Sequence, residues 1–355
     1  MSAAPPSMGV EEEFLLVSAS GRPLPRSVDV AGGTKDVDVK LELTKPQVEI
    51  NSPVCASSAE LRSHLVKMRA AVAASAARHG ARLLAVGVPP RGEAQQLVTD
   101  KPRYQEMVQR YGLMTREQAV CGCHVHIDVP SREAAVQVSN HLRPWMPTLL
   151  ALTANSPIYL GTDTGFASWR WIMWSRWPCS GPPPFFESAD HYNALVAMQL
   201  AAGSILDEKM VYWDIRPSSH LPTVEVRISD VPLSVDETAL LATLIRSLVM
   251  TARQGDAAPV VDPEVLRAAC WAAARGGLTE PGLDVFRTRV LPMPALLELL
   301  VQHVRPALVE LGELDFVEQT LQQVLATGNG AVRQRKAFHQ GDDVVDVVAL
   351  TGSTE

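Results

Sequence analysis

The chain has 355 residues, of which 46% are hydrophobic and 20% charged, and its formal net charge at pH 7 is −7. These values are typical of a globular enzyme with one large domain or two smaller ones. The negative charge offers no general attraction for nucleic acid or for an anionic membrane, so an anionic ligand would need local arginines or bound cations. We find no apolar run of 18 residues and no signal peptide, and we expect no membrane helix.

The five cysteines are few and odd in number, which favours the reducing cytoplasm over a disulfide scaffold. Cys121 and Cys123 form a C-x-C pair, but zinc sites of this kind normally need a second pair. A zinc site is therefore the weaker interpretation of these two residues.

Hydrophobic patterns predict the elements in chain order. Strand-like runs at 9–17 and 37–51 are followed by a long helix that starts with the cap-like Ser57-Ser58-Ala59-Glu60 and runs to about Gly80. We then expect strands at 82–88 and 117–129, helices near 131–142, 145–154 and 190–207, strands at 210–216 and 222–230, and helices over most of 234–327.

Two segments lack such patterns. Residues 155–187 are rich in Gly, Pro and Trp, and their four tryptophans favour an ordered loop. Residues 341–355 are expected to be a flexible tail after a single catalytic domain that spans 1–340. Strands without regular βαβ alternation indicate an α+β fold with an antiparallel sheet flanked by helices.

Alternate residues of a strand share one face, which sorts the polar side chains of each strand. Five strands show one apolar face and one face rich in Glu, His, Asp and Arg. The residues on the polar faces are Glu11 and Glu13; Gln47, Glu49 and Asn51; His124, His126 and Asp128; Tyr212, Asp214 and Arg216; and Thr223, Glu225, Arg227 and Ser229. Glu42 lies seven residues before Glu49, beyond Pro46, so the two-residue period does not fix which face it takes.

A solvated sheet face is the ordinary explanation for such alternation. These faces, however, have almost no lysine and instead carry carboxylates, imidazoles and arginines, which bind divalent cations and phosphates. If they line one concave sheet, so many carboxylates can stay ionised together only beside cations. Oxygen ligands with an imidazole suit Mg²⁺ or Mn²⁺. We therefore expect a metal site made by Glu11, Glu13, Glu42, Glu49 and Glu225 with His124 or His126.

Divalent cations combined with arginines suit phosphoryl transfer. The candidate arginines are Arg170, Arg176, Arg216, Arg227, Arg333 and Arg335. The chain has neither a P-loop motif nor the glycine pattern of a Rossmann fold, so a bound nucleotide would be held by metals and arginines.

Seven motifs in order, GVEEEF, QVEINSP, GCHVHI, LTANSPIYLGTDTGFASWR, WSRWPCSGPP, YWDIRPSSHLPTVEVRISDVP and GNGAVRQR, resemble the glutamate–cysteine ligase type 2 family of bacterial carboxylate–amine ligases. The resemblance runs from about residue 9 to 338. It implies a glutamine-synthetase-like fold, in which a curved antiparallel sheet forms a funnel. It also implies ATP-dependent amide formation through an acyl phosphate, typically from the γ-carboxylate of glutamate and the amine of cysteine, with Mg²⁺ or Mn²⁺. Small molecules would be the only partners besides a second copy in a homodimer.

The resemblance also implies roles for single residues. Glu11, Glu13, Glu49 and Glu225 match metal ligands, His126 matches a ligand of metal or phosphate, and Glu42 is a plausible addition. Arg170 and Arg227 match catalytic residues that bind substrate or phosphate, and Arg333 and Arg335 match ligands of the nucleotide phosphates. Arg176 and Arg216 join them as candidates for cofactor binding.

Two positions depart from the family pattern. Asp128 stands where relatives commonly have Gly, and Cys179 stands in place of a Thr, and both are expected near the cleft. An added carboxylate there would favour a substrate with a basic group. Two other function classes stay open: a metal-dependent amide hydrolase built on His124 and His126, and a non-catalytic homologue that binds ATP.

Overall fold

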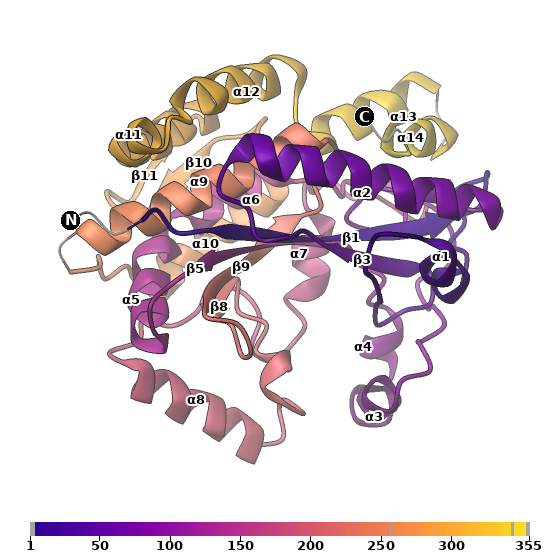
Figure 1. Cartoon of the computed structure of the whole chain (residues 1–355), viewed down its shortest axis with the longest axis horizontal. Helices are drawn as coiled ribbons and strands as arrows, with labels where there is room; N and C mark the ends of the chain where they lie inside the picture. Colours follow the sequence, from indigo (N-terminus) through magenta and orange to yellow (C-terminus); the bar gives the residue numbers. More distant parts are fainter. Residues whose placement is uncertain (1–3, 256, 342–343, 353–355) are drawn as a thin grey trace.

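A computed structural model describes residues 4–255, 257–341 and 344–352. Its centre is an antiparallel sheet in the order β2-β3-β1-β5-β9-β8, with β4 paired to β1 beside this path (Figure 1). The strands are β1 (Met8–Val17), β2 (Val39–Leu41), β3 (Gln47–Asn51), β4 (Arg82–Leu84), β5 (Gly122–Asp128), β8 (Ile215–Pro217) and β9 (Thr223–Asp230). The predicted α+β class with an antiparallel sheet is confirmed.

Helices α2 (Ser58–Arg78) and α9 (Val235–Gln254) lie along one face of the sheet, above it in Figure 1. Helix α2 begins where the sequence predicts, because the hydroxyl of Ser57 accepts from the Glu60 amide while the Glu60 carboxylate accepts from the Ala56 amide. The cap satisfies one free amide of the first helical turn, that of Glu60, and also ties down the residue before the cap, Ala56. The covered face carries the apolar residues of the strands, so it forms the core.

Glu12 of β1 points into this core, opposite its neighbours Glu11 and Glu13. Its carboxylate is fully buried and accepts from Arg69 Nε of α2 at 2.9 Å and from the Thr238 hydroxyl of α9 at 2.6 Å. Burying a carboxylate is costly unless it is paired and hydrogen-bonded, and both conditions are met here. Glu12 is therefore a structural residue that joins the sheet to both covering helices.

The remaining elements surround this two-layer centre. They are α1 (Ser27–Gly33), α3 (Pro102–Tyr111), α4 (Leu113–Arg116), α5 (Arg132–Leu142), η1 (Arg143–Trp145), α6 (Met146–Thr153), α7 (Trp169–Trp174), α8 (Ala189–Ala201), η2 (Glu208–Met210), α10 (Pro263–Gly276), α11 (Met293–Leu311), α12 (Leu314–Thr327), α13 (Gly330–Gly341) and α14 (Val344–Thr351), with the hairpins β6 (Ile158–Tyr159) to β7 (Thr162–Asp163) and β10 (Gly282–Asp284) to β11 (Arg289–Leu291). Within the described residues, no helix combines the length and apolar character that crossing a membrane requires.

The structure refines several expected elements. The region 37–51 contains two antiparallel strands, β2 and β3, because the chain reverses between them at residues 44–46, where Pro46 offers no amide for pairing. The Trp-rich segment 155–187 is ordered, as predicted, and includes α7. The hairpin from β10 to β11 lies inside a region expected to be helical.

The chain end also differs from the expected tail. Helix α14 buries Val344, Val347 and Val348 in the apolar cluster that contains β4, and the Ala85 amide donates to the Thr351 carbonyl at 3.0 Å. Residues 342–343 and 353–355 of the expected tail lie outside the described residues.

Candidate active site

Pairing between β1 and its two neighbours aligns acidic and imidazole side chains on the face of the sheet opposite the core. Glu13 stands opposite Glu49 of β3, and Glu11 stands opposite His124 of β5. Opposed residues of antiparallel strands have neighbouring Cβ atoms, so these side chains meet. The Glu11 carboxylate contacts His124 Nδ1 at 3.0 Å and lies 3.5 Å from His126 Nε2.

The polar face continues across β9 and β8. His126 stands opposite Glu225, which in turn stands opposite Arg216. Arg216 Nε donates to the Glu225 carboxylate at 2.9 Å, and Arg227 also pairs with Glu225. His126 Nδ1 lies 2.9 Å from the Thr223 hydroxyl, which orients the ring so that Nε2 faces Glu11. Strand pairing therefore gathers side chains from five strands into one constellation.

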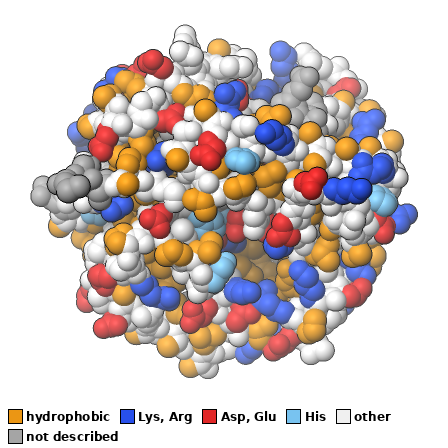
Figure 2. All heavy atoms as spheres, viewed as in Figure 1, with side chains coloured by type: hydrophobic (Ala, Val, Ile, Leu, Met, Phe, Trp, Pro, Cys, Tyr) orange, Lys and Arg blue, Asp and Glu red, His pale blue; other side chains and the backbone are white. Residues whose placement is uncertain are grey.

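A cavity of about 380 Å³ opens over this constellation. Figure 2 shows a hollow below the centre of the molecule, with lysine and arginine side chains gathered at its edge. Among the residues predicted for the site, the cavity is lined by Glu11, Glu13, Glu42, Glu49, His124, Arg216 and Arg227. The buried Glu225 and His126 lie beneath them and contact them directly.

Four carboxylates in and beneath the cavity, Glu11, Glu42, Glu49 and Glu225, form two groups with opposite pKa shifts. Burial together with the charges of Glu13 and Glu11 raises the pKa of Glu42 to about 8. Burial and the same neighbours, with Glu42, raise the pKa of Glu49 well above its ordinary value. Glu42 thus holds its proton at neutral pH when no cation is near, and the pKa of Glu49 is shifted in the same direction, since an apolar surrounding and like charges both disfavour ionisation.

Glu11 and Glu225 behave in the opposite way. Burial opposes the ionisation of Glu11, but hydrogen bonds and positive charge from His124 and His126 outweigh it and lower the pKa of Glu11. Burial likewise opposes ionisation of Glu225, and its arginine partners hold its pKa far below the usual range. The cavity therefore combines permanently ionised carboxylates with carboxyl groups that a cation could deprotonate.

Three overlapping groups of side chains have the donors of a cation site. Each group has its ligand atoms within 4.8 Å of one another. The groups are Glu11, Glu49 and His124; Glu11, His126 and Glu225; and Glu13, Glu42 and Glu49. The Nε2 atoms of His124 and His126 are buried without a hydrogen-bond partner, as ligand atoms would be. Carboxylate oxygens with one imidazole suit Mg²⁺ or Mn²⁺, so these side chains could hold the expected divalent cations.

Arg170 and Arg176, predicted for the same site, do not line the cavity. The buried Arg170 lies under the start of β5, where a Cβ on Gly122 would come within 2.1 Å of its Nη2. Its guanidinium lies 3.4 Å from the Ile228 carbonyl, and its Nε has no partner. Arg176 is exposed and pairs with Glu117 at 2.7 Å.

Arg333 and Arg335 of α13 also lie outside the cavity lining. Arg333 pairs with Glu237 of α9, and Arg335 lies 3.1 Å from Asp163 of β7. Their phosphate role stays a prediction.

The motif that carries these arginines has a structural function. The buried Asn329 donates to the Ala151 carbonyl at 2.9 Å, and the buried Gln334 donates to the Asn155 side chain at 2.6 Å. These bonds fasten α13 to the end of α6.

The cavity has further walls that sequence patterns did not indicate. Besides Tyr212, which the strand pattern places on a polar face, it is lined by Lys40, Lys101, Arg103, Tyr104 and Trp174. Three of these lie at the start of α3, a helix absent from the prediction. Pro102 at its first turn was an available sign of a helix start. No local pattern could show that α3 faces the sheet.

Two further expectations from the sequence are corrected. Asp128 is exposed and does not line the cavity, and Cys179 is buried with its thiol donating to the Met210 carbonyl at 2.9 Å. Neither residue can therefore select a basic substrate by direct contact. Cys121 and Cys123 are both fully buried in apolar clusters, which agrees with a core role.

Comparison with known proteins agrees with this geometry. The model of the glutamate–cysteine ligase family 2 (GCS2) matches residues 7–349. "Putative glutamate--cysteine ligase 2-1" of Nocardia farcinica is 52% identical over 98% of this chain and 93% of its own length. "Putative glutamate--cysteine ligase 2-2" of Mycolicibacterium vanbaalenii is 50% identical over 97% of this chain and 96% of its own length.

Two solved structures share the fold at low identity. A glutamate–cysteine ligase from Francisella tularensis in complex with AMP aligns with a TM-score of 0.69 and 14% identity over 99% of this chain and 88% of that chain. A bifunctional glutathione synthetase from Pasteurella multocida aligns with a TM-score of 0.73 and 16% identity over 98% of this chain, which spans 51% of that protein. The chain belongs to glutamate–cysteine ligase family 2 and is a ligase that forms carbon–nitrogen bonds.

Proposed function

We propose that this protein is an ATP-dependent carboxylate–amine ligase that forms an amide through an acyl phosphate. The γ-carboxylate of glutamate is the favoured acid, and an amino acid such as cysteine is the favoured amine. The observation that carries the proposal is the overlap of the three groups of possible cation ligands in one cavity, where Glu11 and Glu49 each belong to two groups. Sites of this composition hold several divalent cations, as ATP-dependent phosphoryl transfer requires.

The side chains have separate tasks in this proposal. Glu11, Glu225 and His126 would hold one cation, and Glu13, Glu42 and Glu49 another. Bound cations would supply positive charge to the phosphate oxygens of ATP. Arg227 lines the same cavity, and its buried Nε has no hydrogen-bond partner. We assign this N–H to an oxygen of the transferred phosphoryl group, where charge develops during transfer.

The other walls of the cavity suit amino-acid substrates. Lys40, Lys101 and Arg103 give it positive charge that can pair with substrate carboxylates. Tyr104 and Trp174 supply aromatic surface for their apolar parts. The AMP bound by the Francisella tularensis ligase supports an adenine nucleotide as the second ligand. A homodimer is part of the proposal and is checked by light scattering.

An ADP-release screen over pairs of amino acids, with Mg²⁺ or Mn²⁺, tests the reaction. We expect ADP to form only when a metal, an acid and an amine are all present, and mass spectrometry to show the corresponding amide. Amide cleavage that needs metal but no ATP would contradict the proposal and favour a hydrolase built on His124 and His126. ATP binding without turnover for any pair would favour a non-catalytic homologue.

A further inference from the structure

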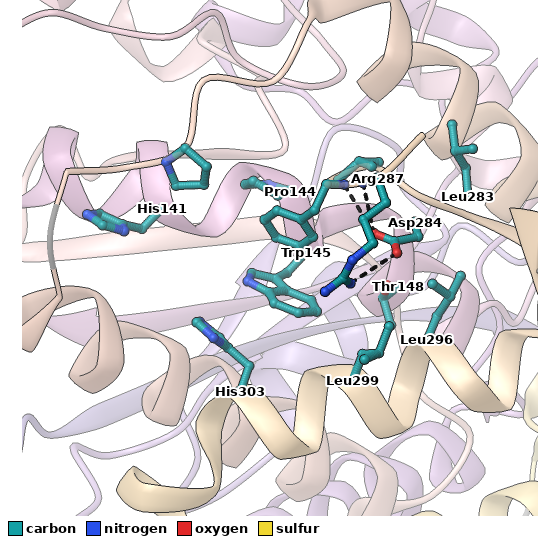
Figure 3. Close-up of a pocket in the computed structure, with 13 residues that line it drawn as sticks. His141, Pro144, Trp145, Thr148, Leu283, Asp284, Arg287, Leu296, Leu299 and His303 are labelled. Carbon is teal, nitrogen blue, oxygen red and sulfur yellow. Dashed lines mark hydrogen bonds and ion pairs between the residues drawn. The ribbon is translucent and has the colours of Figure 1, made fainter. Parts of the chain in front are cut away.

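A second cavity of about 460 Å³ lies beside the hairpin from β10 to β11 (Figure 3). Its walls come from α5, η1 and α6 on one side, from the hairpin between β10 and β11, and from α11. It shares no lining residue with the first cavity. Its volume lies in the range of small-molecule pockets, which are concave and mostly apolar with a few polar groups.

Aromatic rings form one wall of this second cavity. The indole of Trp145 is stacked on the His303 ring, with centroids 4.9 Å apart and an angle of 26° between the planes. The ring of Phe286 lies 5.0 Å from Trp145 on the hairpin side. Leu296 and Leu299 of α11 add apolar surface. Such walls favour a flat, apolar ligand group, since ring faces and edges pack best against another ring.

Several polar groups of the second cavity have no partner among the described residues. The hydroxyl of the buried Thr148 and the rings of His141 and His303 line the space and make no hydrogen bond there. Burial lowers the pKa of His141, and burial together with His141 lowers the pKa of His303. Both imidazoles are therefore neutral at pH 7, with one donor and one acceptor nitrogen each to offer a ligand.

The charge at the mouth is positive. The buried Asp284 accepts from Arg287 at 3.4 Å and from Arg289 at 3.1 Å, so one carboxylate faces two guanidinium groups. Arg287 lines the cavity and is largely exposed, with N–H groups left over for a ligand. An anion is favoured over a cation at this place, because Asp284, Arg287 and Arg289 together carry one net positive charge.

We propose that the second cavity binds a planar aromatic carboxylate of about the size of an indole acid. Its ring packs beside Trp145 and Phe286, and its carboxylate meets Arg287 at the mouth. This site is independent of the proposed ligase reaction, because the ligand is recognised by different residues.

Calorimetric titration of the full-length protein with indole-3-acetate tests this proposal directly. Tryptamine has the same ring with a positive charge, and acetate has the carboxylate without a ring. We expect indole-3-acetate to bind at least about tenfold more tightly than either, since ring and charge both contribute. Absence of indole-3-acetate binding, or equal affinity for tryptamine, would overturn the proposal.

Variants of the hairpin locate the site. Phe286 is 44% exposed, so Phe286→Ala should fold, and we expect it to weaken indole-3-acetate binding at least about fivefold. Arg287→Gln leaves Arg289 to pair with Asp284 and should weaken binding about threefold or more. Val290→Ala is the matched control, because Val290 belongs to the same hairpin but does not line the cavity. Unchanged affinity in both test variants, or a similar loss in the control, would place the ligand elsewhere.

Discussion

Glu11 of β1 stands directly opposite His124 of β5, and its carboxylate lies 3.0 Å from the Nδ1 atom of that imidazole. The other oxygen of Glu11 lies 3.5 Å from His126 Nε2. One carboxylate thus contacts both imidazoles of the strand and belongs to two of the three possible cation groups. Removal of this carboxylate should therefore weaken both cation groups to which it belongs.

Glu11→Gln should lower ADP release at least about 100-fold, because it removes a fixed negative charge from the place where cations are needed. The fold should persist, since Glu11 points into the cavity and away from the core. ADP-release assays with circular dichroism check both statements. Asp128→Asn, on the exposed end of β5, is the matched carboxylate control and should keep full activity. Full activity in Glu11→Gln would refute the assignment.

Cation binding should release protons at pH 7. Glu42, with a pKa of about 8, is protonated in the metal-free cavity and must ionise to become a ligand, and the raised pKa of Glu49 acts in the same direction. We expect release of about one to two protons per protein. Calorimetric titration with Mn²⁺ in buffers of different ionisation enthalpy measures this number. Glu42→Gln should reduce it, whereas heats that do not depend on the buffer would exclude the mechanism.

Glu42 should make the metal-free protein lose stability, relative to the Glu42→Gln variant, as the pH rises from about 4.5 to 8. The unfolded Glu42 loses its proton near 4.5, but the folded Glu42 keeps it to about 8, so the unfolded state binds fewer protons in this window. Thermal melts in the presence of a chelator check the direction. Added Mn²⁺ should raise Tm more at pH 8 than at pH 5. A Tm that changes with pH up to pH 8 without metal in the same way as that of Glu42→Gln would contradict the shift.

Substitution of Glu12 should lower the stability of the fold, whereas substitution of its neighbour Glu11 should lower the activity. Glu12→Gln breaks a fully buried ion pair with Arg69 and should lower the free energy of unfolding by about 3 kcal/mol. Urea denaturation measures this loss. The double variant Glu12→Leu with Arg69→Met removes both charges and should recover most of the stability. A double variant as unstable as Glu12→Gln would show that packing, and not the unpaired charge, sets the cost.

Arg333→Ala tests the family assignment of the C-terminal motif. The motif predicts that this change chiefly raises the KM for ATP several-fold, as loss of a phosphate contact would. Steady-state kinetics over a range of ATP concentrations measure it. An unchanged KM with a lower Tm would instead limit Arg333 to its ion pair with Glu237.

The sequence was sufficient to predict which side chains share a sheet face. The two-residue period of strands placed Glu11, Glu49 and Glu225 correctly, because one apolar and one polar face fix the orientation of each strand. It could not place α3 or Arg170, since their positions depend on how distant segments pack. Asp128 shows the same limit. It falls on the same strand face as His124 and His126 by the two-residue alternation, but it lies at the end of β5, beyond the cavity.

The carboxylate of Glu11, which two of the groups share, has a consequence for how the cavity binds cations. Glu11 belongs both to the group with His126 and Glu225 and to the group with His124 and Glu49, so ions placed in these two groups would share its negative charge. Occupancy of one position therefore changes the affinity of the other, so the two cannot titrate as independent equivalents. Curves of cation binding against cation concentration should be cooperative or biphasic. Their steepness should depend on Glu11.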